Sequence, residues 1–73
     1  MALQTFREYE IPAGKTPGDY RYRIDEIWDG GSTDILYTDS RAEVDRIVPM
    51  MLYQAYKAQV TDQQTGSVES FAD

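Results

Sequence analysis

The chain contains neither cysteine nor histidine, and this absence limits how so short a sequence can be held together. With 73 residues it forms one small domain, and a domain of this size buries only about 60% of the surface that its unfolded chain exposes. Small domains are often stabilised by disulfides or structural zinc, whose ligands are missing here. We therefore expect stability to come from close packing or from self-association.

The same absences and the charge of the chain exclude several classes of function. Without cysteine or histidine there is no thiolate nucleophile, no ordinary catalytic triad and no proton shuttle at neutral pH. Seven Lys and Arg oppose thirteen Asp and Glu, giving a net charge of -6. This charge disfavours nucleic-acid binding, because phosphate neutralisation needs clustered cations. We therefore expect a non-enzymatic protein with no cofactor, no metal and no direct contact with nucleic acid.

Two further local patterns do not indicate a function. Gly14-Lys15-Thr16 matches the end of a phosphate-binding loop, but Tyr9 stands where that motif requires glycine. The most apolar stretch, 47–52, is much shorter than the roughly 20 residues of a membrane-spanning helix, and the N-terminus lacks a basic and apolar leader. We expect no membrane partner and a cytoplasmic location.

Three segments have the composition of antiparallel strands: 3–11, 20–28 and 34–38. In the second segment, large apolar side chains share one face: Tyr20, Tyr22, Ile24 and Trp28. We interpret them as core beneath a helix, in preference to a base-stacking platform. Glu26 falls on the same face and interrupts it, which indicates a bulge. The loop 12–19 contains a predicted type II turn at Pro17-Gly18, and Asp29-Gly30-Gly31-Ser32 predicts a hairpin turn.

A helix is predicted after the third strand. Ser40 and Glu43 have the spacing of a capping box. Apolar side chains then recur on one helical face: Val44, Ile47, Val48, Met51 and Ala55. Pro49 lies within this pattern, so we expect a continuous helix, kinked at Pro49, that runs to about Val60.

These elements predict an α+β fold in which a three-stranded antiparallel sheet packs on one C-terminal helix, in the order β-β-β-α. Residues 1–60 form the single domain. Residues 61–73 form a polar tail that is either frayed or a weak edge strand held by Val68 and Phe71.

Two groups of residues are candidates for binding a partner. The first is an acidic cluster around the predicted hairpin, whose spacing does not match a calcium loop: Asp25, Glu26, Asp29 and Asp34. It is either a solvated surface or a contact for a basic partner. The second is a row on the outer face of the predicted helix: Met50, Tyr53 and Lys57. Tyr and Met are enriched at the centres of interfaces, although single exposed residues of these types also occur on monomers.

The sequence therefore favours a non-enzymatic acidic module that binds a protein partner with a basic surface. Small acidic inhibitors that bacteriophages encode, such as anti-CRISPR or host-takeover proteins, offer an analogy of size and charge. Such a protein acts as a nucleic-acid mimic and occludes the partner's nucleic-acid-binding surface. The alternative is a structural or assembly protein that forms a homodimer through its helix.

Overall fold

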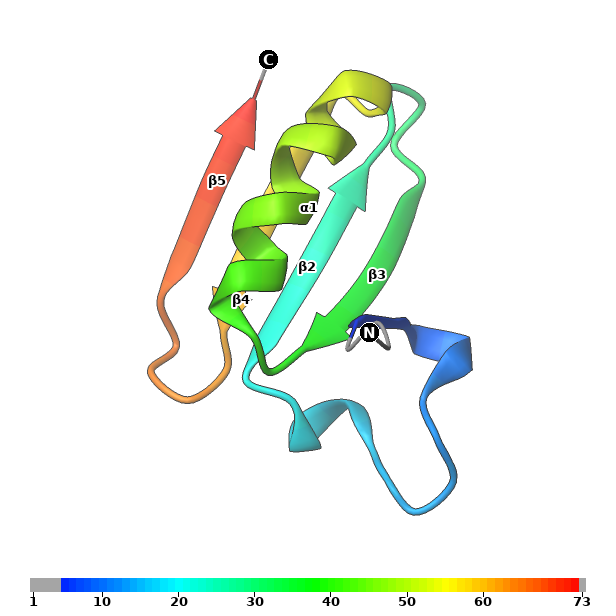
Figure 1. Ribbon diagram of the computed structural model, residues 1–73. Coiled ribbons are helices and arrows are strands. Elements are labelled where there is room, and N and C mark those ends of the chain that lie inside the picture. Colours follow the sequence, from blue (N-terminus) through cyan, green and yellow to red (C-terminus); the bar gives the residue numbers. More distant parts are fainter. Residues whose placement is uncertain (1–4, 73) are drawn as a thin grey trace.

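The computed structural model describes residues 5–72, which form one antiparallel sheet with a single α-helix on one face (Figure 1). Two single-turn 3-10 helices precede the second strand, at Glu8–Glu10 and Pro17–Asp19. The other elements, in chain order, are β1 (Thr5–Arg7), β2 (Tyr22–Ile27), β3 (Thr33–Thr38), α1 (Arg41–Gln54), β4 (Lys57–Asp62) and β5 (Val68–Ala72). No helix within residues 5–72 is long and apolar enough to cross a membrane.

The α+β class is confirmed, but the prediction of a three-stranded sheet is wrong. The sheet has five strands in the order β1-β3-β2-β4-β5. β2 and β3 pair in unbroken register from Tyr22 opposite Thr38 to Ile27 opposite Thr33, so the predicted bulge is absent. The predicted strand over 3–11 contributes only the three residues of β1, which pair with the end of β3, and Leu3 lies outside the described residues.

The first additional strand, β4, replaces the predicted end of the helix. α1 ends at Gln54 and not at Val60, and the Ala55 N–H donates to the Met51 carbonyl at 2.7 Å. The Tyr56 N–H then donates to the Ile27 carbonyl at 3.0 Å, so the chain joins the edge of β2 at once. Polar and apolar residues alternate through β4, with Ala58 and Val60 buried beneath the helix.

The second additional strand, β5, follows a tight turn in the segment assigned to the polar tail. The Asp62 side chain accepts the backbone N–H of Gln64 at 3.0 Å, and the Asp62 N–H donates to the Ser67 carbonyl at 2.8 Å. Gly66 has a φ of +81°, a conformation that side chains disfavour. The turn directs Val68–Ala72 back along the free edge of β4.

The main core lies between α1 and the sheet. Its fully buried members come from β2, α1 and β4: Tyr22, Ile24, Val44, Val48, Met51, Ala58 and Val60. Met51 is therefore a core residue, as predicted, whereas Ile47 is only partly buried at the margin of this cluster. α1 lies over β2 and β4, while β3 runs beside it (Figure 1).

A smaller aromatic cluster covers one end of the opposite sheet face. Tyr20 was predicted to lie beneath the helix, but it packs between Phe6 and Tyr37, with ring centroids 6.0 and 6.2 Å away. The reason is that the strand begins only at Tyr22, so Tyr20 does not follow the alternation of β2. Gly18 lies in the 3-10 turn without a positive φ, so the predicted type II turn is also absent.

The start of α1 follows the prediction in part. The Ser40 side chain accepts the Glu43 N–H at 3.3 Å, which is one half of a capping box. The Glu43 carboxylate does not return to the Ser40 backbone but accepts from Arg46 at 2.5 Å. The helix continues through Pro49, which lies on its exposed side.

Candidate functional site

The structure divides the predicted acidic cluster between three places. Asp25 lies on the sheet face opposite α1 and is bound by the Arg23 guanidinium, with Nε 3.0 Å from Oδ1. Asp29 is exposed in the hairpin turn. Glu26 and Asp34 are direct register partners on the sheet face that carries α1. Glu26 is only 5% exposed, so the expectation that it faces water is wrong.

The predicted helical row is also divided. Met50 and Tyr53 lie on α1 and are 56% and 94% exposed. Lys57 is not helical, because α1 ends at Gln54 and Lys57 begins β4. It pairs with Ile27 on the sheet face that points away from α1. Only Met50 and Tyr53 therefore remain on a common surface.

A cleft opens between the C-terminal half of α1 and the strands β2 and β3. Its volume is about 200 Å³. It exists because α1 lies over β2 and β4 and leaves the start of β3 without a helical cover (Figure 1). We call it the Glu26 cleft, and its lining residues are Arg7, Glu26, Trp28, Leu36, Arg46, Ile47, Met50, Met51 and Gln54.

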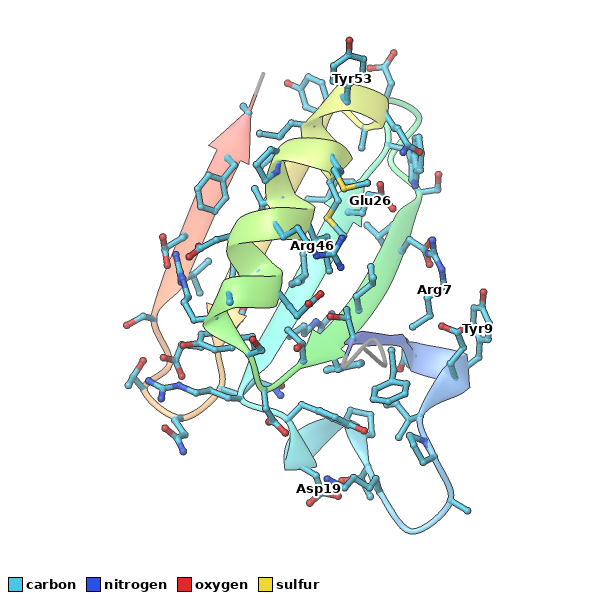
Figure 2. The ribbon with its side chains drawn as sticks, in the orientation of Figure 1. Arg7, Tyr9, Asp19, Glu26, Arg46 and Tyr53 are labelled. Carbon is cyan, nitrogen blue, oxygen red and sulfur yellow. The ribbon has the colours of Figure 1, made fainter. Side chains whose placement is uncertain are left out.

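The carboxylate of Glu26 has no hydrogen-bond or ion-pair partner within residues 5–72. No fully enclosed side-chain oxygen or nitrogen in this part of the chain lacks a partner, so the Glu26 oxygens must reach the cleft surface. Figure 2 shows Glu26 and Arg46 on the side of α1 that faces β3.

Both arginines that line the cleft are already engaged. Arg7 pairs with Asp34 from β3, and Arg46 pairs with Glu43 on α1. Together with Glu26, these pairs comprise three carboxylates and two guanidinium groups. The immediate surroundings of the cleft therefore carry one uncompensated negative charge, which belongs to Glu26.

An apolar groove lies next to the cleft, on the C-terminal part of α1. It has a volume of about 350 Å³ and is lined by Pro49, Met50, Tyr53 and Gln54. Met50 and Gln54 line both the cleft and this groove, which we call the Tyr53 groove. These two shared residues place the groove that Tyr53 lines next to the cleft that Glu26 lines.

The remaining arginines are also neutralised locally. Arg21 binds Asp62, and Arg41 binds both Asp45 and Glu69. Hydrogen bonds from Arg21 lower the pKa of the Asp62 carboxyl, and hydrogen bonds from Arg41 lower the pKa of the Glu69 carboxyl. All five arginines of the chain are therefore paired, whereas Glu8, Glu26 and Asp29 have no such cation within residues 5–72.

The cleft presents one carboxylate, two paired guanidinium groups, one amide and apolar side chains. Within residues 5–72 no three acidic side chains converge as metal ligands, and the cleft contains no hydroxyl that is paired with a base. Sequence reasoning missed the cleft, although Glu26 gave a signal. A charged residue at an inward position of an otherwise apolar strand face needs a structural or functional reason.

Comparison with known protein families, curated proteins and solved structures gave no match in any of the three. The interpretation of this surface therefore depends on its own geometry.

Proposed function

We propose that this chain is a non-enzymatic module that binds a protein partner carrying a basic surface. One observation supports this most directly: the most exposed aromatic residue, Tyr53, lines a groove that shares Met50 and Gln54 with the cleft of Glu26, a carboxylate without a partner within residues 5–72. Tyrosine supplies large contact area at low entropic cost, and such residues dominate the energetics of many interfaces.

The charge distribution favours a basic partner. With every arginine paired and a net charge of -6, the long-range field around the chain is that of its excess carboxylates. Such a field accelerates encounter with a cationic surface and weakens as salt screens it. A partner surface that normally binds nucleic acid meets this requirement, and its occupation by the acidic chain excludes the phosphates.

The test compares two exposed tyrosines. Tyr53 borders the groove, whereas Tyr9, which is 80% exposed, lies on the 3-10 helix after β1 and lines neither the groove nor the cleft (Figure 2). The immobilised chain captures proteins from a lysate of its source cells, and each captured protein is then purified and its affinity measured by surface plasmon resonance. We expect Tyr53→Ala to weaken the affinity at least tenfold, and Tyr9→Ala to leave it within about twofold.

The salt dependence of the same measurement tests the electrostatic part. The association rate of the genuine partner should fall as salt rises, and nucleic acid should compete with the chain for it. Equal losses for the two tyrosine variants would contradict the proposed surface. A chain that dimerises at micromolar concentration, and loses this dimer in Tyr53→Ala, would instead identify the groove as a homodimer interface.

A further inference from the structure

Glu26 is a buried carboxylate whose requirement for donors is met by no residue in the described part of the chain. It is 5% exposed and lies opposite a second carboxylate, Asp34, on the adjacent strand. Like charges that face each other across a strand pair are unfavourable, and Asp34 is paired with Arg7 while Glu26 has no cation within residues 5–72. A ligand that brings a positive charge and hydrogen-bond donors satisfies this position.

The walls of the cleft select the shape of that ligand. Trp28 and Leu36 line the cleft from the sheet side, and Met50 and Met51 from the helix side, so a ligand that contacts the carboxylate also contacts hydrocarbon and an indole ring. An extended apolar stem with a cationic tip fits this set of contacts. Lysine and arginine side chains have this form.

We propose that the Glu26 cleft is the receptor for one arginine side chain of the protein partner. The guanidinium lies against the Glu26 carboxylate, and the stem runs along Trp28 and Met50. Arginine is favoured over lysine because its planar fork matches both carboxylate oxygens and stacks on an aromatic face. This inference rests on the proposed function for the origin of the arginine, and it adds the residue that is recognised.

Arg46 is the internal competitor for this position, because it lines the same cleft. Its guanidinium is held 2.5 Å from the Glu43 carboxylate, which also accepts the Thr5 hydroxyl at 3.5 Å. Glu43 therefore retains Arg46 at the cleft margin and leaves Glu26 open. Removal of the Arg46 charge should strengthen the binding of an external guanidinium, because one competing cation is lost.

The test uses the isolated chain and small probes, so it does not depend on any partner. N-acetyl-arginine methylamide is titrated into the labelled protein and followed by two-dimensional amide NMR. Trp28 is the only tryptophan of the chain, so its indole N–H gives a single resonance from the cleft wall. Three further derivatives serve as comparisons. The citrulline derivative tests the need for a charge, the lysine derivative tests the shape of the head group, and the glutamate derivative tests the sign of the charge. Citrulline has nearly the shape of arginine without its charge.

We expect saturable shifts at Trp28 and the cleft residues with arginine, at least fivefold weaker binding with lysine, and no saturation with citrulline or glutamate. Glu26→Gln should weaken arginine binding at least tenfold, whereas Asp25→Asn should not change it. Asp25→Asn is matched because it removes the same charge from the same strand on the opposite face. Arg46→Gln should strengthen binding about twofold or more.

Several results overturn the inference. Equal responses to arginine and citrulline, a stronger response to glutamate, or unchanged arginine binding in Glu26→Gln would each do so. The arginine-citrulline comparison on the wild-type chain needs no variant and stays valid if Glu26→Gln misfolds. The two experiments can fail independently. A negative arginine titration does not contradict partner binding through Tyr53, and a negative capture experiment does not contradict a positive arginine titration.

Discussion

Glu26 occupies an inward position on β2, two residues from Ile24, which is completely buried. A carboxylate in such a place is stabilised less than in water unless donors surround it. We predict that Glu26→Gln raises the free energy of unfolding by about 1 kcal/mol at neutral pH, because the amide carries no charge to desolvate. Urea denaturation followed by circular dichroism measures this difference.

The control for this stability measurement is Asp25→Asn. This change breaks the Arg23–Asp25 pair on the half-exposed sheet face, so it should lower stability by less than about 1 kcal/mol or leave it unchanged. A similar rise in both variants would show that only the net charge of the chain matters. That result would contradict a specific cost at Glu26.

At the residue scale, the sequence predicted the core side chains whose burial depends on a single local periodicity, either that of a strand or that of a helix. Tyr22 and Ile24 follow strand alternation, and Val44 and Met51 follow helical spacing, and all four are core residues. The same alternation places Glu26 on the inward face, whereas its grouping with Asp25, Asp29 and Asp34 rests only on closeness in sequence. Consecutive strand residues point to opposite faces, so such a group cannot stay together. Its same-face neighbour Ile24 was the better guide.

Pro49 removes one backbone hydrogen bond from the interior of α1. It has no N–H to donate to the Asp45 carbonyl, and its ring crowds the preceding turn, yet the helix continues to Gln54. We predict that Pro49→Ala raises the free energy of unfolding by about 1–3 kcal/mol, since Pro49 is exposed and its replacement removes no core contact. Thermal and urea unfolding measure the gain.

Ala42→Pro offers the converse control within the same helix. Ala42 lies in the first turn of α1, where a missing N–H costs little, so this change should alter stability much less than a proline in the interior. If Pro49→Ala leaves stability unchanged, the neighbouring residues already compensate for the missing hydrogen bond. The expectation of a helix weakened at this point would then be wrong.

The Arg41–Glu69 ion pair joins α1 to the edge strand β5, with Nη1 2.8 Å from Oε1. It lowers the pKa of the Glu69 carboxyl below the ordinary value of 4.5. A carboxyl whose pKa is lower in the folded state stabilises the fold above its unfolded pKa and loses this contribution as pH falls through the folded value. Acid should therefore loosen β5 from α1.

We predict that Glu69→Gln reduces the fall in melting temperature between about pH 6 and about pH 3. The variant lacks the pair at every pH, so it starts lower and loses less on acidification. Asp29→Asn, which removes an exposed acid without an ion pair, should not reduce this fall. Identical pH profiles for wild type and Glu69→Gln would show that the pair contributes nothing to folding.

At the element scale, the helix start and the central hairpin could be predicted from local signals such as Ser40 and the turn glycine Gly31. The end of the helix could not. Ala55 and Ala58 fit helical spacing from Met51, while Ala58 and Val60 also fit a strand. The segment becomes a strand and not a continued helix because the edge of β2 offers hydrogen bonds to the chain from Tyr56 onward. That edge is a tertiary feature.

For the whole molecule, the sheet order places β4, which comes late in the chain, next to the central strand β2. We predict that a fragment of residues 1–56 is unfolded by amide NMR and circular dichroism, because it lacks β4 and two core residues, Ala58 and Val60. A fragment of residues 1–66 lacks only the edge strand β5 and should fold with reduced stability. A folded 1–56 fragment would contradict the central role of β4.

The Glu26 cleft belongs to this same scale. Met50 and Tyr53 were identified from the helix pattern, and Glu26 from the acidic cluster, but nothing in the sequence placed Glu26 beside Met50. Their proximity depends on where α1 crosses the sheet and on β3 lying outside its cover (Figure 1). Side-chain periodicity does not determine that crossing point.

The position of β4 between β2 and β5 also determines when this protein can fold as it is made. Synthesis proceeds from the N-terminus, so β2 leaves the ribosome long before its neighbour at residues 57–62 does. During that interval one backbone edge of β2 is unpaired, next to the apolar side chains that later form the core. Until β4 is in place, this edge can pair with strands of other chains.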